Sequence, residues 1–99
     1  MKKRRQHFLT LDKFGSAIGL GPLEKEVVHQ KNRIIDYLKK ERTKRGLSQA
    51  ELAKKVGTQQ PAIARMEAGQ VGSVSFDFLI RVALAIGISL ELVSSKKAA

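Results

Sequence analysis

The sequence predicts an all-helical domain with a short C-terminal β-strand. Three features of its 99 residues support this fold class. Apolar residues recur at helical spacing through most of the chain, and glycines stand where the helical patterns stop. Residues 88–93 follow a two-residue period, with Ile88, Leu90 and Leu92 on one side and Ser89, Glu91 and Val93 on the other, as in a strand. We expect four to five helices within residues 23–87, preceded by an arm (1–22) and followed by a strand and tail (88–99).

The N-terminal arm follows no single period. A basic tetrad spans residues 2–5, and scattered apolar residues lead into the glycine-rich run GSAIGLGP. We therefore expect residues 1–22 to be flexible. Pro22 suits the first turn of a helix, and an apolar pattern with helical spacing then continues as far as Gly46. Residues 24–45 are predicted to form one long helix, or two short helices broken near residues 29–32.

Residues 47–69 predict two short helices joined by a tight turn. Ser48 and Glu51 have the spacing of a capping box, and Gly57 suits the left-handed position that ends a helix. Thr58 and Gln59 offer N-capping side chains to the second helix, and Pro61 fits its first turn. The apolar residues of the two helices fall on inward faces: Leu52, Ala53, Val56, Ile63 and Met66.

Ala53 is small at the point where these two helices must cross. A larger side chain would push the helices apart, whereas alanine lets the second helix stand out from the domain and enter a DNA major groove. The alternative is an ordinary αα-hairpin with a glycine turn. That alternative accounts for Gly57 but not for Gln59 and Gln60 at the start of the second helix, so a helix-turn-helix is favoured.

The remaining residues predict a loop, a further helix and the strand. GQVGSVS reads as a loop, Ser75 as a helix cap, and Gly87 as the end of that helix, whose core residues are Leu79, Val82, Ala83 and Ile86. In the strand, one side carries Ile88, Leu90 and Leu92. A lone strand leaves unpaired amides, so we expect it to pair with the same strand of a second subunit. The alternative is a short fifth helix or a frayed tail.

Composition favours a small binding protein over an enzyme. The chain has 19 basic and 9 acidic residues, a net charge of +10 and no cysteine, so it should attract polyanions and form no disulfide or thiolate metal site. His7 and His29 are isolated, and we expect no catalytic residues, cofactor or metal. No apolar run approaches the roughly 20 residues that span a bilayer, so we expect a cytoplasmic protein that does not bind membranes. A single domain of this size also favours dimerisation.

Residues 31–93 resemble the Xre or Cro/CI-type helix-turn-helix proteins, which include lambdoid phage repressors and antitoxins of the HigA and HipB kind. The resemblance lies in SQAELA, in QPAIARMEAG and in the ALAIG ending of the later helix. It implies a lambda-repressor-like fold, an extra strand exchanged across a homodimer, and a sequence-specific repressor of a palindromic operator. It also implies that the protein is the antitoxin of a type II toxin–antitoxin pair, with a RelE-type ribonuclease toxin as partner. The alternative is a phage-type or stand-alone repressor without a toxin.

DNA base contacts are expected from the second helix of the motif. Gln60 and Arg65 can both lie on its exposed side, where glutamine pairs with adenine and arginine with guanine. Ala62 can touch a thymine methyl group, and Gln59 adds a further candidate. The resembling repressors carry two consecutive glutamines at the matching positions, whereas the second position here is Pro61, which has no donor. The alternative is an ordinary solvated helix face.

DNA phosphate contacts are expected from both ends of the motif. Ser48 and Gln49 lie at a helix N-terminus, and Gln49 matches the family residue that binds the DNA backbone. The full set is Ser48, Gln49, Thr58, Gly69, Gly72 and Ser73. Because the loop after the motif has no basic residue, additional charge is expected from Lys44, Arg45, Lys54 or the arm.

Two further sets of residues complete the expectations. Arg42 and Glu67 lie on the inner sides of their helices and match a family ion pair, so we expect a partly buried salt bridge, with a surface pair as the alternative. Ile80 and Leu84 fall outside the core stripe of their helix and are candidates for dimer contact. The apolar residues of the arm and first helix would suit a toxin surface, or would cover the protein's own core: Phe8, Leu9, Leu11, Phe14, Val27 and Val28.

Overall fold

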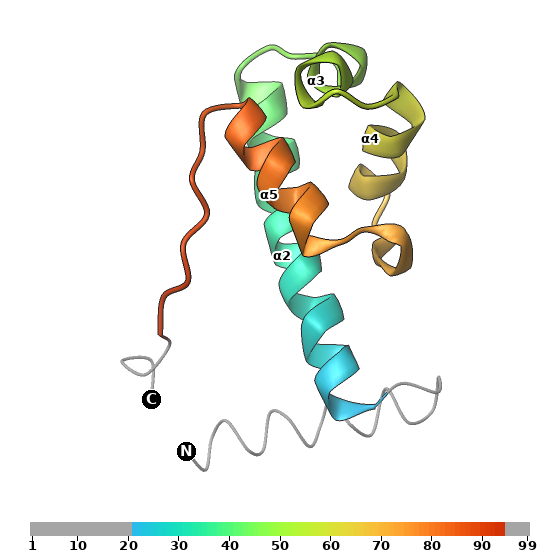
Figure 1. Cartoon of the computed structure of the whole chain (residues 1–99), viewed down its shortest axis with the longest axis vertical. Coiled ribbons are helices and arrows are strands. Elements are labelled where there is room, and N and C mark those ends of the chain that lie inside the picture. The colour runs from blue at the N-terminus through green and yellow to red at the C-terminus, as the bar shows by residue number, and fades with distance from the viewer. Residues whose placement is uncertain (1–20, 95–99) are drawn as a thin grey trace. The chain divides into compact units, whose positions relative to one another are not determined.

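The computed structural model describes residues 21–94, which form four α-helices and one short 3₁₀ helix (Figure 1). The predicted arm, apart from its last two residues, lies outside the described residues. The helices are α2 (Pro22–Lys44), α3 (Gln49–Val56), α4 (Gln60–Glu67) and α5 (Phe76–Ala85), with η1 (Val71–Ser73) between the last two. Residues 31–90 make up one compact unit, which contains the whole helix-turn-helix. The described parts of the other unit are residues 21–30 and 91–94.

Helix α2 is continuous, so of the two forms that the sequence allowed it takes the single long helix. Glu24 helps to cap the N-terminus of the helix, because its Oε1 accepts a hydrogen bond from the Gly21 amide at 3.1 Å. Pro22 occupies the first helical position, where its missing N–H leaves no hydrogen bond unmade. In the second half of the helix, Ile35 and Leu38 point into the core and are almost fully buried.

The two helices of the motif begin and end for local reasons. Ser48 and Glu51 form a complete capping box, with hydrogen bonds of 3.0 and 2.8 Å between each side chain and the other's backbone amide. Gly57 has φ +85°, a left-handed conformation that costs glycine no strain. The amides of Gly57 and Thr58 then both bond the Ala53 carbonyl at 2.9 Å. Ala53 itself is buried where α3 packs against α4.

The start of α4 differs from the sequence prediction in one detail. Gln59 occupies the N-cap position, but its side chain makes no capping hydrogen bond. Pro61, in the first turn of α4, has no backbone N–H. The missing cap therefore leaves fewer backbone donors unpaired at this helix end than it would if residue 61 were not a proline. Gln59 is consequently an exposed side chain that is not committed to the helix end.

The expected loop after α4 contains a 3₁₀ turn over Val71–Ser73. Val74 is buried directly after this turn, and its amide bonds the Val71 carbonyl at 3.1 Å. Lys31 of α2 donates its ammonium to the carbonyls of Val71 and Val74. The buried end of the loop is therefore tied to α2 through main-chain acceptors, an arrangement that the apolar pattern around Lys31 did not reveal.

Helix α5 matches its predicted cap and core. The Ser75 hydroxyl oxygen accepts a hydrogen bond from the Phe78 amide at 3.1 Å, and Gly87 follows the helix with a positive φ. The core stripe of α5 meets residues from every other α-helix. Across residues 31–90, the buried apolar side chains are Ile35, Leu38, Leu52, Ala53, Ile63, Met66, Val74, Leu79, Val82, Ala83 and Ile86.

Residues 88–94 form neither helix nor strand, and the described part of the chain contains no strand at all. The Ile88 amide bonds the Ala83 carbonyl at 2.8 Å, and the side chains of Ile88 and Leu90 pack partly against the core. Leu92 is fully exposed. A strand exists only where its backbone pairs with another strand, so the predicted exchange across a dimer stays a prediction.

Candidate DNA-binding surface

Helix α4 has one buried face and one exposed face. Ile63 and Met66 are completely buried, whereas Gln60, Pro61 and Arg65 are exposed. With 100° between successive residues, Gln60 lies toward the edge beside α3, and Ala62 toward the edge beside α5. Arg65 projects between them. Both glutamine and arginine, the predicted base-reading residues, are thus accessible on a helix whose inner face is fixed by the core.

On the α3 edge, a chain of side-chain hydrogen bonds holds Gln60. Its Nε2 donates to Oε1 of Gln49 at 2.8 Å, and Nε2 of Gln49 donates to Oε1 of Glu67 at 3.0 Å. Gln60 keeps its second amide hydrogen and its carbonyl oxygen available. Those two groups are the donor and acceptor that an adenine edge requires. The predicted phosphate-binding residue Gln49 therefore also orients the predicted base-reading residue.

The chain ends in the ion pair between Arg42 and Glu67. Nε of Arg42 lies 2.6 Å from Oε2 of Glu67, and Nη2 lies 2.9 Å from Oε1, which makes the pair bidentate. The remaining amino group, Nη1, donates to the Leu47 carbonyl at 2.6 Å. The side chains are 11% and 2% exposed, respectively. The pair thus joins α2 to α4 and to the segment that leads into α3.

The surroundings favour the charged forms of both partners. Burial alone would raise the pKa of Glu67, but hydrogen bonds from Arg42 and Gln49 and the nearby positive charges lower that pKa below its ordinary value of 4.5. The hydrogen bond to Glu67 raises the pKa of Arg42 in turn, against the opposing effect of its partial burial. Glu67 is therefore an anion at neutral pH, with all of its bonds to α2 and α3 in place.

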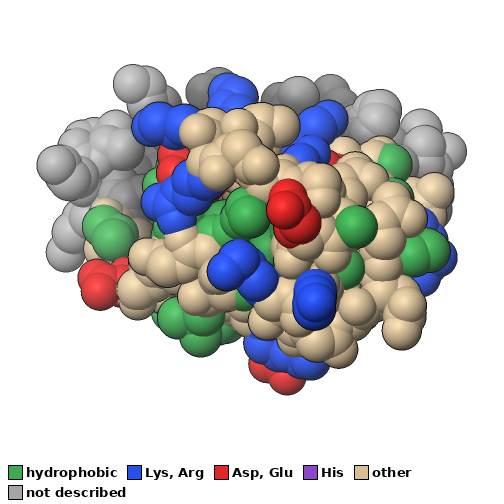
Figure 2. Space-filling view, turned by 90° about the horizontal axis from the view of Figure 1, so that it is seen from above, with side chains coloured by type: hydrophobic (Ala, Val, Ile, Leu, Met, Phe, Trp, Pro, Cys, Tyr) green, Lys and Arg blue, Asp and Glu red, His purple; other side chains and the backbone are tan. Residues whose placement is uncertain are grey.

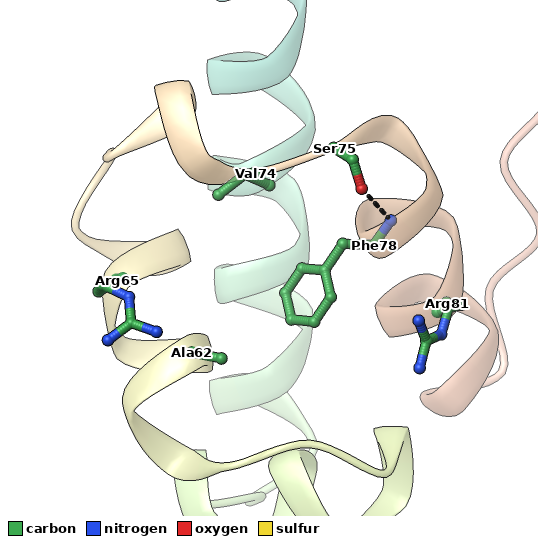
Figure 3. A pocket seen from close by; sticks show the side chains of 6 residues that line it. All are labelled: Ala62, Arg65, Val74, Ser75, Phe78 and Arg81. Atoms are coloured by element: carbon green, nitrogen blue, oxygen red, sulfur yellow. Dashed lines mark hydrogen bonds between the residues drawn. The ribbon is translucent and has the colours of Figure 1, made fainter.

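On the α5 edge, α4 borders a half-open pocket of about 280 Å³ (Figure 3). Its walls are formed by Ala62, Arg65, Val74, Ser75, Phe78 and Arg81. Arg65 and Arg81 stand on opposite sides, with the Phe78 ring and the Ala62 methyl between them. Ala62 is half-buried on this wall.

The predicted phosphate-binding residues are spread over several local environments. The Ser48 hydroxyl oxygen accepts a hydrogen bond from the Glu51 amide within the capping box. Thr58 is half-buried in the turn between α3 and α4. The Gly69 amide already bonds the Met66 carbonyl at 3.0 Å, so it is not a free donor. Gly72 and the backbone of Ser73 belong to η1. These residues are not gathered into one cluster.

Basic side chains supply the charge that the loop lacks. Figure 2 views the end of the molecule at which α3 lies and shows Lys and Arg side chains spread over that face, with fewer acidic ones among them. Lys54 and Lys55 are exposed in the last turn of α3. Arg45 and Lys44 lie near Glu41, at 3.2 and 3.9 Å, which partly neutralises them.

Two features of this surface escaped the sequence analysis. The Gln49–Gln60 contact joins residues eleven positions apart, and their type alone does not reveal it. The apolar pattern of α5 does not indicate that Arg81 lies on this surface. Its position three residues after Phe78 places both on neighbouring parts of one helix face, which was the available signal.

Replacing Glu67 by glutamine is expected to destabilise the domain. The change removes the charge but keeps the shape, and leaves the Arg42 guanidinium partly buried without its counter-ion. We expect the free energy of unfolding to fall by about 2 kcal/mol, which is less than the ~3–5 kcal/mol lost when a fully buried pair is broken. For a domain of this size the melting temperature should fall by roughly 10 °C. Calorimetry at pH 7 measures it, with Glu91→Gln at an exposed position as the matched control.

The same variant should change the pH dependence of stability. Because the pKa of Glu67 is lower in the folded state, its stabilisation is complete above pH 4.5 and is lost as the pH falls through the folded-state pKa. The wild type should therefore lose more stability than Glu67→Gln between pH 6 and pH 3. Parallel pH profiles for the two proteins would show that folding leaves the pKa of Glu67 unchanged, and would contradict the preferential stabilisation of its charged form.

Comparison with protein families places this surface in a known class. The family model described as "Helix-turn-helix", of the Xre type, matches residues 38–93, which is more than half of the chain and includes α3, α4 and α5. No curated protein and no solved structure gave a significant match. Within residues 21–94, no helix is long and apolar enough to cross a membrane. Members of this family are typically non-enzymatic regulators of transcription that bind DNA. The chain belongs to the Xre-type helix-turn-helix family of DNA-binding domains.

Proposed function

We propose that this protein is a sequence-specific transcriptional repressor that binds a palindromic operator as a homodimer. The observation that carries the proposal is the exposed Gln60, which Gln49 holds in place on the outer side of α4 at 2.8 Å. A glutamine fixed in this way on a solvent-facing helix stabilises no core. Because the hydrogen bond to Gln49 already restricts the Gln60 side chain, less side-chain entropy is lost when Gln60 binds DNA, which favours recognition of a base edge.

Base recognition is assigned to the exposed side of α4. Gln60 pairs with an adenine through its free amide hydrogen and carbonyl oxygen, and Arg65 pairs with a guanine through two parallel hydrogen bonds. Gln59 and Ala62 add a polar and an apolar contact at the two edges of the helix. Pro61 lies between Gln60 and Ala62 on the exposed side and has no donor, so the operator differs from those of relatives with two glutamines.

Backbone contacts are assigned to the first turn of α3 and to the lysines at its end. Ser48 and Gln49 lie at the N-terminus of α3, where the helix dipole favours an anion. Lys54 is exposed and forms no ion pair within the described residues. It therefore adds charge without adding sequence preference.

Alanine variants at Arg65 and Lys54 should separate these two roles. Arg65→Ala should lose about 1–3 kcal/mol of discrimination at one base pair, because the guanine edge loses its partner. Lys54→Ala should weaken binding to all sequences alike and reduce the salt dependence of log K by about two, one for each subunit of the proposed dimer. The measurement is a fluorescence-anisotropy titration over a salt series, with an operator selected from a random library and its single-base variants. Equal losses on all duplexes from Arg65→Ala would remove it from the base-reading residues.

Dimerisation is proposed to involve residues 88–93 and the exposed side of α5. Phe76, Ile80 and Leu84 recur at intervals of four residues on α5 and are 42–59% exposed, which supports an apolar contact surface. Ile88 and Leu90 already pack on their own core, so of the three predicted dimer residues only Leu92 has a fully exposed side chain. Hydrogen bonds between the two backbones would hold the paired strands together more than burial of these side chains would.

A double proline variant, Ser89→Pro with Glu91→Pro, tests the strand exchange. Proline has no N–H and cannot donate to a strand ladder, and both side chains point away from the core contacts of Ile88 and Leu90. We expect the variant to be monomeric by light scattering, whereas the double alanine variant at the same positions stays dimeric. A proline variant of undiminished mass would contradict strand exchange and leave the α5 surface as the dimer contact.

An antitoxin role is the second part of the proposal. It derives from the resemblance to HigA-type and HipB-type proteins, and one observation favours it. Leu23 and Val27, one turn apart in the first half of α2, are 75% and 41% exposed, while Val28 is half-buried. Apolar side chains at this spacing would suit a protein partner such as a RelE-type ribonuclease. The predicted contacts Phe8, Leu9, Leu11 and Phe14 lie outside the described residues.

Co-expression with the product of the adjacent gene tests this role. If that product is a ribonuclease toxin, the two proteins should co-elute, and the protein should restore growth of cells that express the toxin. Leu23→Glu with Val27→Glu should abolish co-elution and leave operator affinity within twofold. A neighbour that is neither toxic nor bound would favour the stand-alone repressor, which acts on DNA in the cytoplasm without a toxin.

A further inference from the structure

We propose that the pocket between α4 and α5 receives a phosphate group of the DNA backbone and that Arg81 binds it. The proposal rests on the proposed function, because it requires α4 to lie in the major groove. It adds a contact on the side of α4 opposite to Gln49, formed by a helix outside the helix-turn-helix.

The two arginines of the pocket differ from the other arginines near the motif. Arg42 is paired with Glu67, and Arg45 with Glu41. By contrast, neither Arg65 nor Arg81 has an ion-pair or hydrogen-bond partner among residues 21–94. Both are exposed, and they face the same hollow from opposite walls (Figure 3). Two unpaired positive charges around one opening create a field that attracts an anion.

The chemistry of the walls favours a phosphate group. The guanidinium of Arg81 offers a fork of donors that matches two phosphate oxygens. The Ser75 hydroxyl uses a lone pair for the Phe78 amide and keeps its hydrogen for donation. Ala62, Val74 and Phe78 supply an apolar surface that offers no competing acceptor.

The dimensions of B-DNA place a phosphate at this edge. An α-helix with its side chains is about 10–12 Å across, and the major groove is about 12 Å wide. A helix in the groove therefore has one DNA strand along each edge. Gln49 and the N-terminus of α3 lie at one edge of α4, and the pocket lies at the other. The strand on the α5 side meets Arg81, while Arg65 on the near wall extends toward the bases.

Arg81→Ala provides the test, measured on a selected operator and on a random duplex of equal length. Loss of one charge-assisted phosphate contact from each subunit of the proposed dimer should lower affinity about a hundredfold on both duplexes and reduce the salt dependence of log K by about two. Arg81→Lys should keep the salt dependence and recover part of the affinity, because it keeps the charge but loses the fork. Circular dichroism checks that each variant folds, as expected for an exposed residue with no ion-pair or hydrogen-bond partner among residues 21–94.

Arg33→Ala is the matched control. Arg33 is an exposed arginine on α2 that makes no ion pair within residues 21–94, so its removal changes the net charge equally. We expect its effect on affinity to stay within twofold. If Arg33→Ala and Arg81→Ala lost equal affinity for DNA, the change in net charge alone would account for the effect of Arg81→Ala. That result would overturn the pocket assignment.

The outcomes separate the pocket from the proposed function. If the wild type binds neither duplex, the proposed function fails. If the wild type binds DNA and Arg81→Ala matches it in affinity and salt dependence, only the phosphate contact fails. A last arm titrates inorganic phosphate into DNA-free protein and follows the Arg81 Nε–H signal by NMR. Saturation below 1 mM would identify a site for a free anion and overturn the assignment to the DNA backbone, whereas a weak, unsaturated shift supports it.

Discussion

The ion pair between Arg42 and Glu67 is the interaction on which the DNA-binding surface depends. It fixes α4 to α2, and the third donor of Arg42 holds the Leu47 carbonyl at the entrance to α3. From Glu67 the hydrogen bonds continue through Gln49 to Gln60. The position of the exposed Gln60 side chain is therefore set by a buried carboxylate two hydrogen bonds away. A variant that weakens this carboxylate would disturb stability and recognition together.

Helix α4 needs such support because it is too short to be stable alone. It has eight residues, of which only Ile63 and Met66 are fully buried, and isolated helices below about 12 residues are marginal in water. Its two edges are supported differently. The α3 edge is held by polar side chains in fixed geometry. The α5 edge borders an open pocket whose two arginines have no ion-pair partner in the part of the chain that the structure describes. The first arrangement favours precise readout of bases, and the second favours attraction of the DNA backbone.

The sequence predicted those features that depend on neighbouring residues. The capping box at Ser48, the left-handed Gly57 and the core stripe of α5 follow from local spacing, and the structure contains all three. Features that depend on how helices cross were missed, among them the Lys31 contacts to the loop carbonyls and the pocket beside Arg81. No local pattern encodes a contact between side chains that are brought together only by tertiary packing. The predicted strand over 88–93 belongs to a further class, because a strand forms only where its backbone pairs with another strand, and residues 21–94 contain none.

A second copy of the protein would double the base recognition that we propose for this surface. Pro61 removes one donor from the exposed side of α4, which leaves Gln60 and Arg65 as the pair able to bond two atoms of a base. Each such contact contributes about 1–3 kcal/mol of discrimination, so one subunit reaches about 2–6 kcal/mol. Specific DNA binding typically exceeds non-specific binding by about 4–10 kcal/mol. A net charge of +10 strengthens binding to every sequence alike, so it adds nothing to the discrimination between sequences. Two subunits on a palindrome double the discrimination, so the ability to find an operator and the ability to dimerise depend on the same association.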